Sequence, residues 1–198
     1  MNGELPKGWV WTSLGNICTI QGGYAFKSKE YQEKGIPLLR ITNIYNSKII
    51  FENKDNVYLD ENYLVSLDRY VVKRHDILIA LSGVNTGKIG IYELDHSSLL
   101  NQRVGRLNFH SPLYSYNYVL HYLEHIRNDV LKKTYGAAQP NISTIQLEIM
   151  KIPLPPLAEQ KRIVNKIEEL FTNLDKGVES LEQVKYKLKV YRDRKSVV

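Results

Sequence analysis

The sequence contains almost no cysteine and no long apolar run. Cys18 is the single cysteine among 198 residues, which excludes an internal disulfide and a cysteine-based metal cluster. No apolar run approaches the roughly 18 residues of a membrane span. Residues 1–10 also lack the basic start and apolar stretch of a signal peptide. We therefore expect a cytoplasmic protein without a membrane span, with Cys18 in its core.

Signatures of catalysis are also scarce. Residues 83–88 (GVNTGK) resemble a phosphate loop, but they have three residues between the glycines and then Ile89 after the lysine. A P-loop needs four residues there and Ser or Thr after the lysine. No Gly-x-Ser-x-Gly elbow occurs. The stretch is expected to form a tight hairpin turn or a loop that offers polar groups to nucleic acid, and the chain is expected to be non-catalytic.

One metal-binding motif is present in part. Residues 121–125 (HYLEH) fit the H-x-x-E-H pattern of inverted zinc proteases, with both imidazoles on one helical face. Such a site needs a third ligand well downstream, and the only acid after Glu182 is Asp193. Two surface histidines beside an apolar stripe also explain the pattern. We assign no metal ligand in this chain.

The C-terminal part of the chain carries one long helical pattern. From Leu157 to Lys195 a helix would be about 58 Å long, and no other segment matches its length. We expect it to form a homodimer, and packing along its own domain is the alternative. The apolar residues follow alternating steps of four and three, the period of a coiled-coil seam, interrupted only by Gly177: Ile163, Ile167, Leu170, Leu174, Leu181, Val184, Leu188 and Tyr191.

The charges beside this seam favour one helix direction. In a parallel dimer Lys187 would lie opposite Arg192 of the partner subunit, and few acids are available nearby to offset the repulsion. Antiparallel pairing separates these basic ends. It also places the two domains at opposite ends of a rod, related by a two-fold axis.

The preceding residues alternate short strand patterns with a few helical ones. The densest strand pattern is 76–81, and the longest helical pattern is 114–133. We expect an α+β fold: a mixed-sheet domain over residues 1–154, followed by the long coiled-coil helix over residues 155–198. The net charge of +6 suggests a polyanionic partner, although many ordinary proteins are as basic.

Five stretches together resemble one repeat of the DNA specificity subunit of Type I restriction-modification enzymes. The resemblance covers essentially the whole chain, and its last motif is the most specific. The stretches are 5–9 (LPKGW), 35–44 (GIPLLRITNI), 76–80 (DILIA), 139–142 (QPNI) and 152–164 (IPLPPLAEQKRIV).

The resemblance implies a half-length arrangement. Family members usually contain two target recognition domains, each followed by a long helix, and the two helices pack antiparallel as a spacer. This chain has one of each. It is therefore expected to be a half-subunit that dimerises and reads an interrupted palindrome, or else a truncated product of a longer gene.

The resemblance also implies which partners supply the chemistry. The subunit makes and breaks no covalent bond and holds no cofactor. It docks methyltransferase subunits that use S-adenosylmethionine to methylate an adenine taken out of the duplex. Motor-nuclease subunits that consume ATP with magnesium can join them. We expect the apolar edge beside the seam, Val164, Phe171 and Val178, to meet the methyltransferase or the chain's own domain.

The residues that contact DNA are expected in loops that follow strands, because amides and arginines read base edges while tyrosines and lysines contact phosphates. Arg40 and Asn43 lie within a motif typical of members with different targets, which favours a structural or phosphate role. Lys88, Gln102 and Arg103 are favoured for reading sequence. The full set is Tyr24, Lys27, Arg40, Asn43, Ser82, Asn85, Thr86, Lys88, Gln102, Arg103, Tyr135 and Gln139.

Two other functions stay open from the sequence. A coiled-coil interaction protein without base specificity, or a truncated fragment that modulates a full-length specificity subunit, would also need the long helix. An independent enzyme is the third hypothesis.

Overall fold

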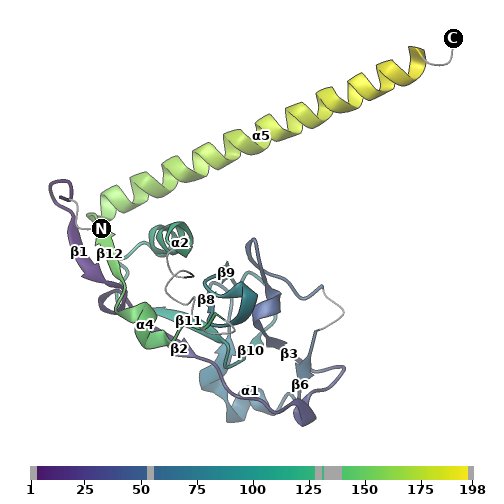
Figure 1. Ribbon diagram of the computed structural model, residues 1–198. Coiled ribbons are helices and arrows are strands. Elements are labelled where there is room, and N and C mark those ends of the chain that lie inside the picture. Colours follow the sequence, from purple (N-terminus) through teal and green to yellow (C-terminus); the bar gives the residue numbers. More distant parts are fainter. Residues whose placement is uncertain (1–3, 53–55, 128–130, 132–139, 196–198) are drawn as a thin grey trace. The chain divides into compact units, whose positions relative to one another are not determined.

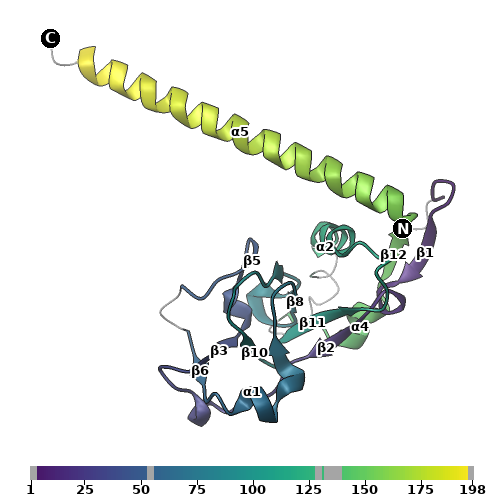
Figure 2. The ribbon, with the colours of Figure 1, turned by 180° about the vertical axis from the view of Figure 1, so that it is seen from behind.

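The computed structural model describes residues 4–52, 56–127, 131 and 140–195, with the side chains of 193–195 excepted. The chain divides into two compact units (Figures 1 and 2), which we call the N-terminal unit, Met1–Pro155, and the C-terminal unit, Pro156–Val198. Among the described residues, no helix combines the length and apolar content that crossing a bilayer demands.

The largest sheet of the N-terminal unit has six strands and is mixed. Its neighbours are antiparallel except for the parallel pair β5 and β9. All four residues of β8 are buried, which explains why this strand reads as a continuous apolar run. In spatial order the strands are β2 (Cys18–Gly22), β11 (Val104–Phe109), β8 (Ile77–Ala80), β9 (Ile89–Ile91), β5 (Ser47–Ile49) and β4 (Ile44–Tyr45).

Two smaller sheets complete the unit. In the four-stranded sheet, β3 and β10 are parallel and the other neighbours are antiparallel. The two-stranded sheet pairs β1 (Val10–Ser13) with β12 (Lys151–Leu154), so the start of the unit lies beside its end. The order of the four-stranded sheet is β6 (Tyr58–Leu59), β3 (Ile36–Leu39), β10 (Ser98–Leu100) and β7 (Val71–Val72).

Two apolar clusters of the core lie on opposite faces of the four-stranded sheet. Side chains alternate between the faces of a strand, so Leu38 and Leu99 join one apolar cluster while Leu39 and Leu100 join the other. Cys18 is also buried, and burial, followed by the charge of Glu148, raises the pKa of its thiol to about 12.

The helices of the N-terminal unit are short. Ser143 caps α4: its hydroxyl accepts from Gln146 N at 3.1 Å while Gln146 Oε1 accepts from Ser143 N at 2.8 Å. The helix expected over 114–133 is α2, which ends at His125, and much of the remainder lies outside the described residues. The helices are α1 (Tyr63–Ser66), α2 (Tyr116–His125) and α4 (Thr144–Glu148), with 3-10 turns η1 (Leu14–Asn16), η2 (Ser28–Glu30), η3 (Ile41–Asn43), η4 (Asp68–Tyr70) and η5 (Gly83–Asn85).

The C-terminal unit is one helix, α5 (Leu157–Lys195). The carbonyl of Pro156 accepts from the N–H groups of Glu159 and Gln160, so the helix begins at the proline run as expected. Mixed sheets followed by a long C-terminal helix confirm the predicted α+β class.

Candidate nucleic-acid interface

Three chain segments of the N-terminal unit form one open groove, which we call the turn groove. The segments are the end of β8, the turn between β10 and β11, and the stretch that leads into α4. The lining residues are Leu81, Ser82, Gln102, Arg103, Pro140, Asn141, Ile142 and Ser143.

Backbone hydrogen bonds hold the three segments side by side. Leu81 N donates to Arg103 O at 2.8 Å, and Ile142 N donates to Leu81 O at 2.9 Å. Gly83 N donates to Pro140 O at 2.8 Å. The walls of the turn groove are therefore fixed by main chain, and its side chains can vary without changing that frame.

Gln102 and Arg103 lie at the corner of the turn between β10 and β11, and both are exposed. The buried Asn101 fixes the turn, because its Oδ1 accepts from Arg103 N at 3.2 Å and its carbonyl accepts from Val104 N at 2.9 Å. Within the described residues, neither exposed side chain has a hydrogen-bond or ion-pair partner. Both are available to bind a ligand.

Tyr24 lies next to this turn. Its N–H donates to Leu100 O at 2.8 Å and its carbonyl accepts from Gln102 N at 2.9 Å. Its ring packs against Phe26 and Tyr70, with centroids 4.9 and 5.4 Å away, and remains 39% exposed. The structure thus brings four of the predicted residues together: Tyr24, Ser82, Gln102 and Arg103.

The polar side chains of the loop after β8 are directed into the protein. Asn85 Nδ2 donates to Ile41 O at 2.9 Å. Thr86 is fully buried, and its hydroxyl lies 2.7 Å from Gly83 O and 3.0 Å from Pro140 O. The hydroxyl oxygen of Ser82 is buried without a partner among the described atoms. The side chains of Asn85 and Thr86 therefore support the loop, and the hydroxyls of Ser82 and Thr86 are not open to solvent.

Asn43 has a similar supporting position. It is 3% exposed, its Oδ1 accepts from Arg40 N at 2.9 Å, and its Nδ2 donates to Ile50 O at 3.0 Å. Asn43 thus has a structural role, one of the two roles favoured above for Arg40 and Asn43, whereas Arg40 contributes only its backbone N–H to this arrangement. Lys27 is exposed, and its N–H donates to Glu30 Oε2 at 2.7 Å.

Lys88 lies in a different groove, together with Glu124 and Arg127 of the α2 region. Arg127 Nε donates to Thr86 O at 3.3 Å. The structure therefore separates Lys88 from Gln102 and Arg103, with which it was grouped for reading sequence. Tyr135 and Gln139 lie outside the described residues.

The phosphate-loop-like stretch and the histidine motif each have a structural explanation. Residues 83–88 connect the antiparallel strands β8 and β9 as a hairpin loop. In the histidine motif, His121 Nδ1 is 3.8 Å from Glu124 Oε2, and Glu124 also accepts from the Ser47 hydroxyl. The described residues include no group of three or more side chains that could hold a metal ion.

Asn141 and Ser143 line the turn groove, but neither is in the predicted set of DNA-contacting residues. Their signal was the neighbouring Gln-Pro-Asn stretch, where only Gln139 was selected. Asn141 is exposed and forms a bridge with Ser82 through the backbone. Its amide adds a donor and an acceptor beside Gln102 and Arg103.

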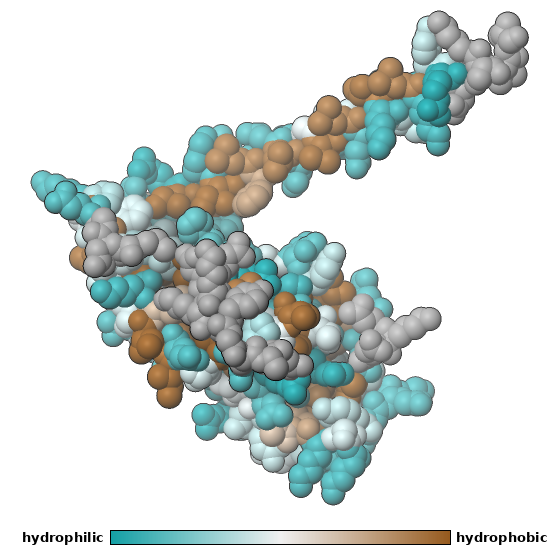
Figure 3. Space-filling model, in the orientation of Figure 1, coloured by the Kyte–Doolittle hydropathy of each residue, from teal (hydrophilic) through white to brown (hydrophobic). Residues whose placement is uncertain are grey.

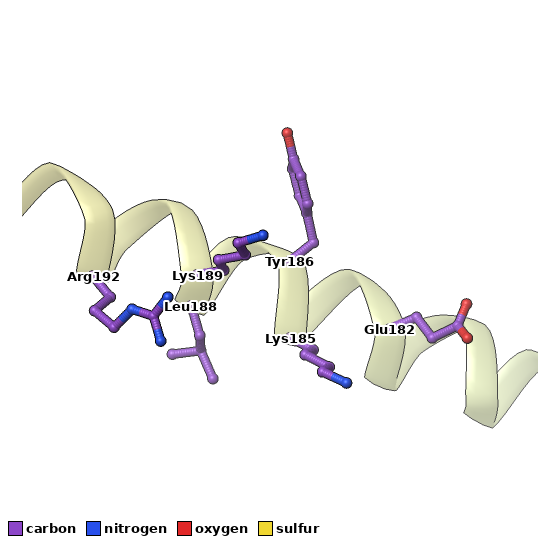
Figure 4. A pocket seen from close by; sticks show the side chains of 6 residues that line it. All are labelled: Glu182, Lys185, Tyr186, Leu188, Lys189 and Arg192. Atoms are coloured by element: carbon purple, nitrogen blue, oxygen red, sulfur yellow. The ribbon is translucent and has the colours of Figure 1, made fainter.

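The second candidate surface is the apolar face of α5, visible as a continuous stripe in Figure 3. From Leu170 onward its apolar seam side chains are each more than half exposed, including Leu174 and Leu181, whereas Ile163 and Ile167 at its start are partly buried. Near the C-terminal end, Lys185, Leu188 and Arg192 point to one side of the helix and Tyr186 to the other (Figure 4). Basic side chains therefore flank the last turns of the seam.

The edge beside the seam is only partly open. Phe171 and Val178 are exposed, whereas Val164 is buried.

Ion pairs between Glu159 and Arg162 at 2.6 Å and between Lys166 and Glu169 at 2.8 Å lie on the same helix. They are exposed and contribute little to stability.

Comparisons with known proteins identify the family. Residues 6–186 match the family described as Type I restriction modification DNA specificity domain. The MjaVIII specificity subunit of Methanocaldococcus jannaschii is 34% identical over 195 residues, covering 94% of this chain and 45% of that protein. The EcoAI specificity subunit of Escherichia coli is 34% identical over 178 residues, covering 87% of this chain and 30% of that protein.

Solved structures share the fold. The HsdS subunit of Thermoanaerobacter tengcongensis has a TM-score of 0.67 at 21% identity, over 88% of this chain and 40% of that one. A chain from a structural study of a type I R-M system has a TM-score of 0.74 at 22% identity, over 95% of this chain and 44% of that one. The chain spans half or less of the length of these relatives. It belongs to the family of Type I restriction-modification DNA specificity domains.

Proposed function

We propose that this chain is a half-length specificity subunit, in which residues 1–154 recognise DNA and residues 155–198 form a dimerisation and spacer helix. One observation carries the proposal. A chain that spans half or less of its relatives contains one unit with a polar turn groove and one long helix with an exposed apolar face. A homodimer would therefore contain two DNA-recognition units and two long helices.

The helix face supports a homodimer. The seam residues Leu174, Leu181 and Leu188 are each at least 60% exposed, and burying such side chains is the main source of stability for a helix of this length. Antiparallel pairing keeps the basic end of one helix away from the basic end of the other. The dimer is then two-fold symmetric, with the DNA-recognising units at its two ends.

A symmetric dimer determines the kind of DNA site. Identical units related by a two-fold axis recognise identical half-sites on opposite strands, separated by the spacer that the helices set. The site is an interrupted palindrome. Within each half-site, Gln102 and Arg103 are the principal reading side chains, and Tyr24 and Lys27 contact the backbone.

The chain itself is non-catalytic and acts with partners. Adenine methyltransferase subunits supply S-adenosylmethionine chemistry and dock on the edge formed by Phe171 and Val178. Motor-nuclease subunits with ATP and magnesium join them for restriction. The complex is cytoplasmic.

The test is to map adenine methylation on plasmid DNA from cells that make this chain together with the methyltransferase subunit encoded in the same genome. A control lacks only this chain. Methylation at an interrupted palindrome, absent from the control, is the expected result. Methylation at two unlike half-sites would contradict the homodimer and indicate mixing with another specificity subunit.

Absence of methylation would contradict DNA reading. It would favour a coiled-coil protein without base specificity, or a fragment that modulates a full-length subunit. Adding a full-length specificity subunit of the same system distinguishes these two, because only a modulating fragment changes the methylation that this subunit directs.

A further inference from the structure

The loop after β8 reverses the usual placement of polar and apolar side chains. Thr86 is fully buried, and Asn85 donates its amide inward, while Val84 between Gly83 and Asn85 is 88% exposed. Val84 is the most exposed large apolar side chain described in the protein. A single exposed valine is ordinary on a surface, but here the protein uses the polar neighbours to hold the loop and leaves the apolar side chain outside.

The loop is also held firmly. Gly83 N donates to Pro140 O at 2.8 Å, Thr86 N to Gly83 O at 3.0 Å, and Gly87 N to Ala80 O at 2.8 Å. Gly83 and Gly87 have φ angles of +72° and +76°, a conformation that suits glycine. Val84 therefore sits on a rigid 3-10 turn, and a rigid apolar group costs little conformational entropy to bury in a complex.

The position of Val84 indicates what covers it. Its neighbour Gly83 bonds to Pro140, which lines the turn groove, so the valine lies next to the rim of that groove. The groove itself offers the side chains of Gln102, Arg103 and Asn141, a set suited to base edges in the major groove. In the major groove of DNA, the apolar feature that the bases present is the 5-methyl group of thymine.

We infer that Val84 is a specificity-determining residue that contacts the 5-methyl group of a thymine, next to the base pairs read from the turn groove. This inference rests on the proposed function, because it assumes that the N-terminal unit reads DNA. It adds an apolar reading element to a surface whose other members are polar.

The test uses the purified full chain and a duplex that carries the mapped methylation site. Because the methylated adenine pairs with thymine, such a duplex contains thymines to vary. Each is replaced in turn by deoxyuridine, which lacks only the methyl group. Affinity is measured by fluorescence anisotropy at fixed salt for the wild type, Val84→Ala and a matched control, Val65→Ala, which removes a valine that is 85% exposed on α1.

One deoxyuridine position is expected to weaken wild-type binding about fourfold, the effect of one buried methyl group. Val84→Ala removes the contact in both half-sites of the proposed dimer, so it should weaken binding to the thymine duplex by about sixteenfold, and it should be insensitive to deoxyuridine at that position. Val65→Ala should behave as the wild type. Binding to a scrambled duplex should be the same for all three proteins.

Two results would overturn the inference. Val84→Ala could bind the thymine duplex as tightly as the wild type, or it could remain as sensitive as the wild type to every deoxyuridine. Failure of the proposed function looks different: the wild type itself would not prefer the mapped duplex over the scrambled one, and the inference would fall with it.

Discussion

The two units of this chain treat their apolar side chains in opposite ways. In the N-terminal unit, leucines such as Leu78 and Leu100 are fully buried, whereas on α5 Leu174 is 60% exposed and Leu181 is 70% exposed. The first unit builds its own core on both faces of the four-stranded sheet. The second exposes the apolar side chains of a core element, and in the proposed homodimer a partner helix would bury them.

This difference separates folding from assembly. Contacts within the N-terminal unit stabilise its fold, so substitutions in its core should change its free energy of unfolding. The C-terminal unit exposes an apolar face that the proposed dimer would bury, so substitutions on this face should change the stability of that dimer.

The largest effect is expected for Leu174→Asp combined with Leu181→Asp. Truncating one buried leucine costs about 2–5 kcal/mol, and the dimer would bury two copies of each position. We expect a monomer at micromolar concentration in analytical ultracentrifugation, with the thermal unfolding of the N-terminal unit unchanged. Thr172→Asp with Gln183→Asp adds the same charges to exposed positions outside the seam and should leave the dimer intact.

A dimer that survives both seam charges would show that α5 does not associate through this face. A dimer lost equally with the control pair would show that net charge, not the seam, decides association.

The corresponding substitution in the N-terminal unit is Leu78→Ala, in the centre of β8. This side chain is fully buried in the larger apolar cluster, so its truncation should lower the free energy of unfolding of the N-terminal unit by about 2–5 kcal/mol. Urea denaturation followed by tryptophan fluorescence measures this loss. The dimer dissociation constant at 25 °C should not change. If both quantities shift together, the two units are not independent.

The same separation explains what the sequence could predict. The α5 pattern repeats over nine seam positions, and its bounds, Leu157 to Lys195, agree with the structure. A helix depends on local hydrogen bonds and a local period, which the sequence contains in full. The buried strand β8 was also predictable, because its apolar run is dense.

Short strands were not predictable in the same way. The sequence did not predict β10 (Ser98–Leu100) or β1 (Val10–Ser13) as strands. β10 has three residues, too few to show alternation, and becomes a strand because β3 and β7 flank it. Its identity therefore depends on partners that are distant in the chain.

The candidate site shows a related limit. Polar loop residues were named from their residue types, but residue type does not say which side chains point outward. The side chains of Thr86 and Asn43 donate to backbone carbonyls, while Gln102 and Arg103 remain exposed. The hydrogen bonds that decide this join segments distant in the chain, such as Thr86 with Pro140.

Smaller effects on DNA binding are expected from one substitution in the turn groove and one in the groove that contains Lys88. Arg103→Ala should weaken binding to the target duplex by about 1–3 kcal/mol and relax one base position, because a base-reading arginine makes sequence-dependent contacts. Lys88→Ala should reduce the salt dependence of binding and leave the preference unchanged. Both variants should remain dimers, because neither residue lies on α5.

The measurement is affinity against a panel of single-base variants of the target at several salt concentrations. Arg74→Ala is the matched control, since Arg74 is exposed and paired with Asp95 at 2.6 Å. If Arg103→Ala leaves both affinity and preference unchanged, the assignment of Arg103 is wrong.

The smallest effect is expected at Gly177, the fifth of the nine seam positions and the one that is not apolar. Apart from its two chain neighbours and the adjacent helix backbone, no described atom lies within 4 Å of a Cβ built at this glycine, so Gly177→Ala should not clash with other side chains of the helix. Replacing a mid-helix glycine with alanine stabilises a helix by about 1 kcal/mol. We expect the thermal midpoint of the α5 transition, followed by circular dichroism, to rise.

The sign of the effect on the dimer is informative in both directions. If Gly177 faces a gap in the seam, the added methyl group fills it, and Gly177→Ala should tighten the dimer. If the partner helix approaches closely at this point, the methyl group displaces it, and the dimer dissociation constant should rise although the isolated helix is more stable. The first outcome is expected, because the leucines on either side, Leu174 and Leu181, are large enough to hold the helices apart. Opposite shifts in helix stability and dimer affinity would instead identify Gly177 as the crossing point of the two helices.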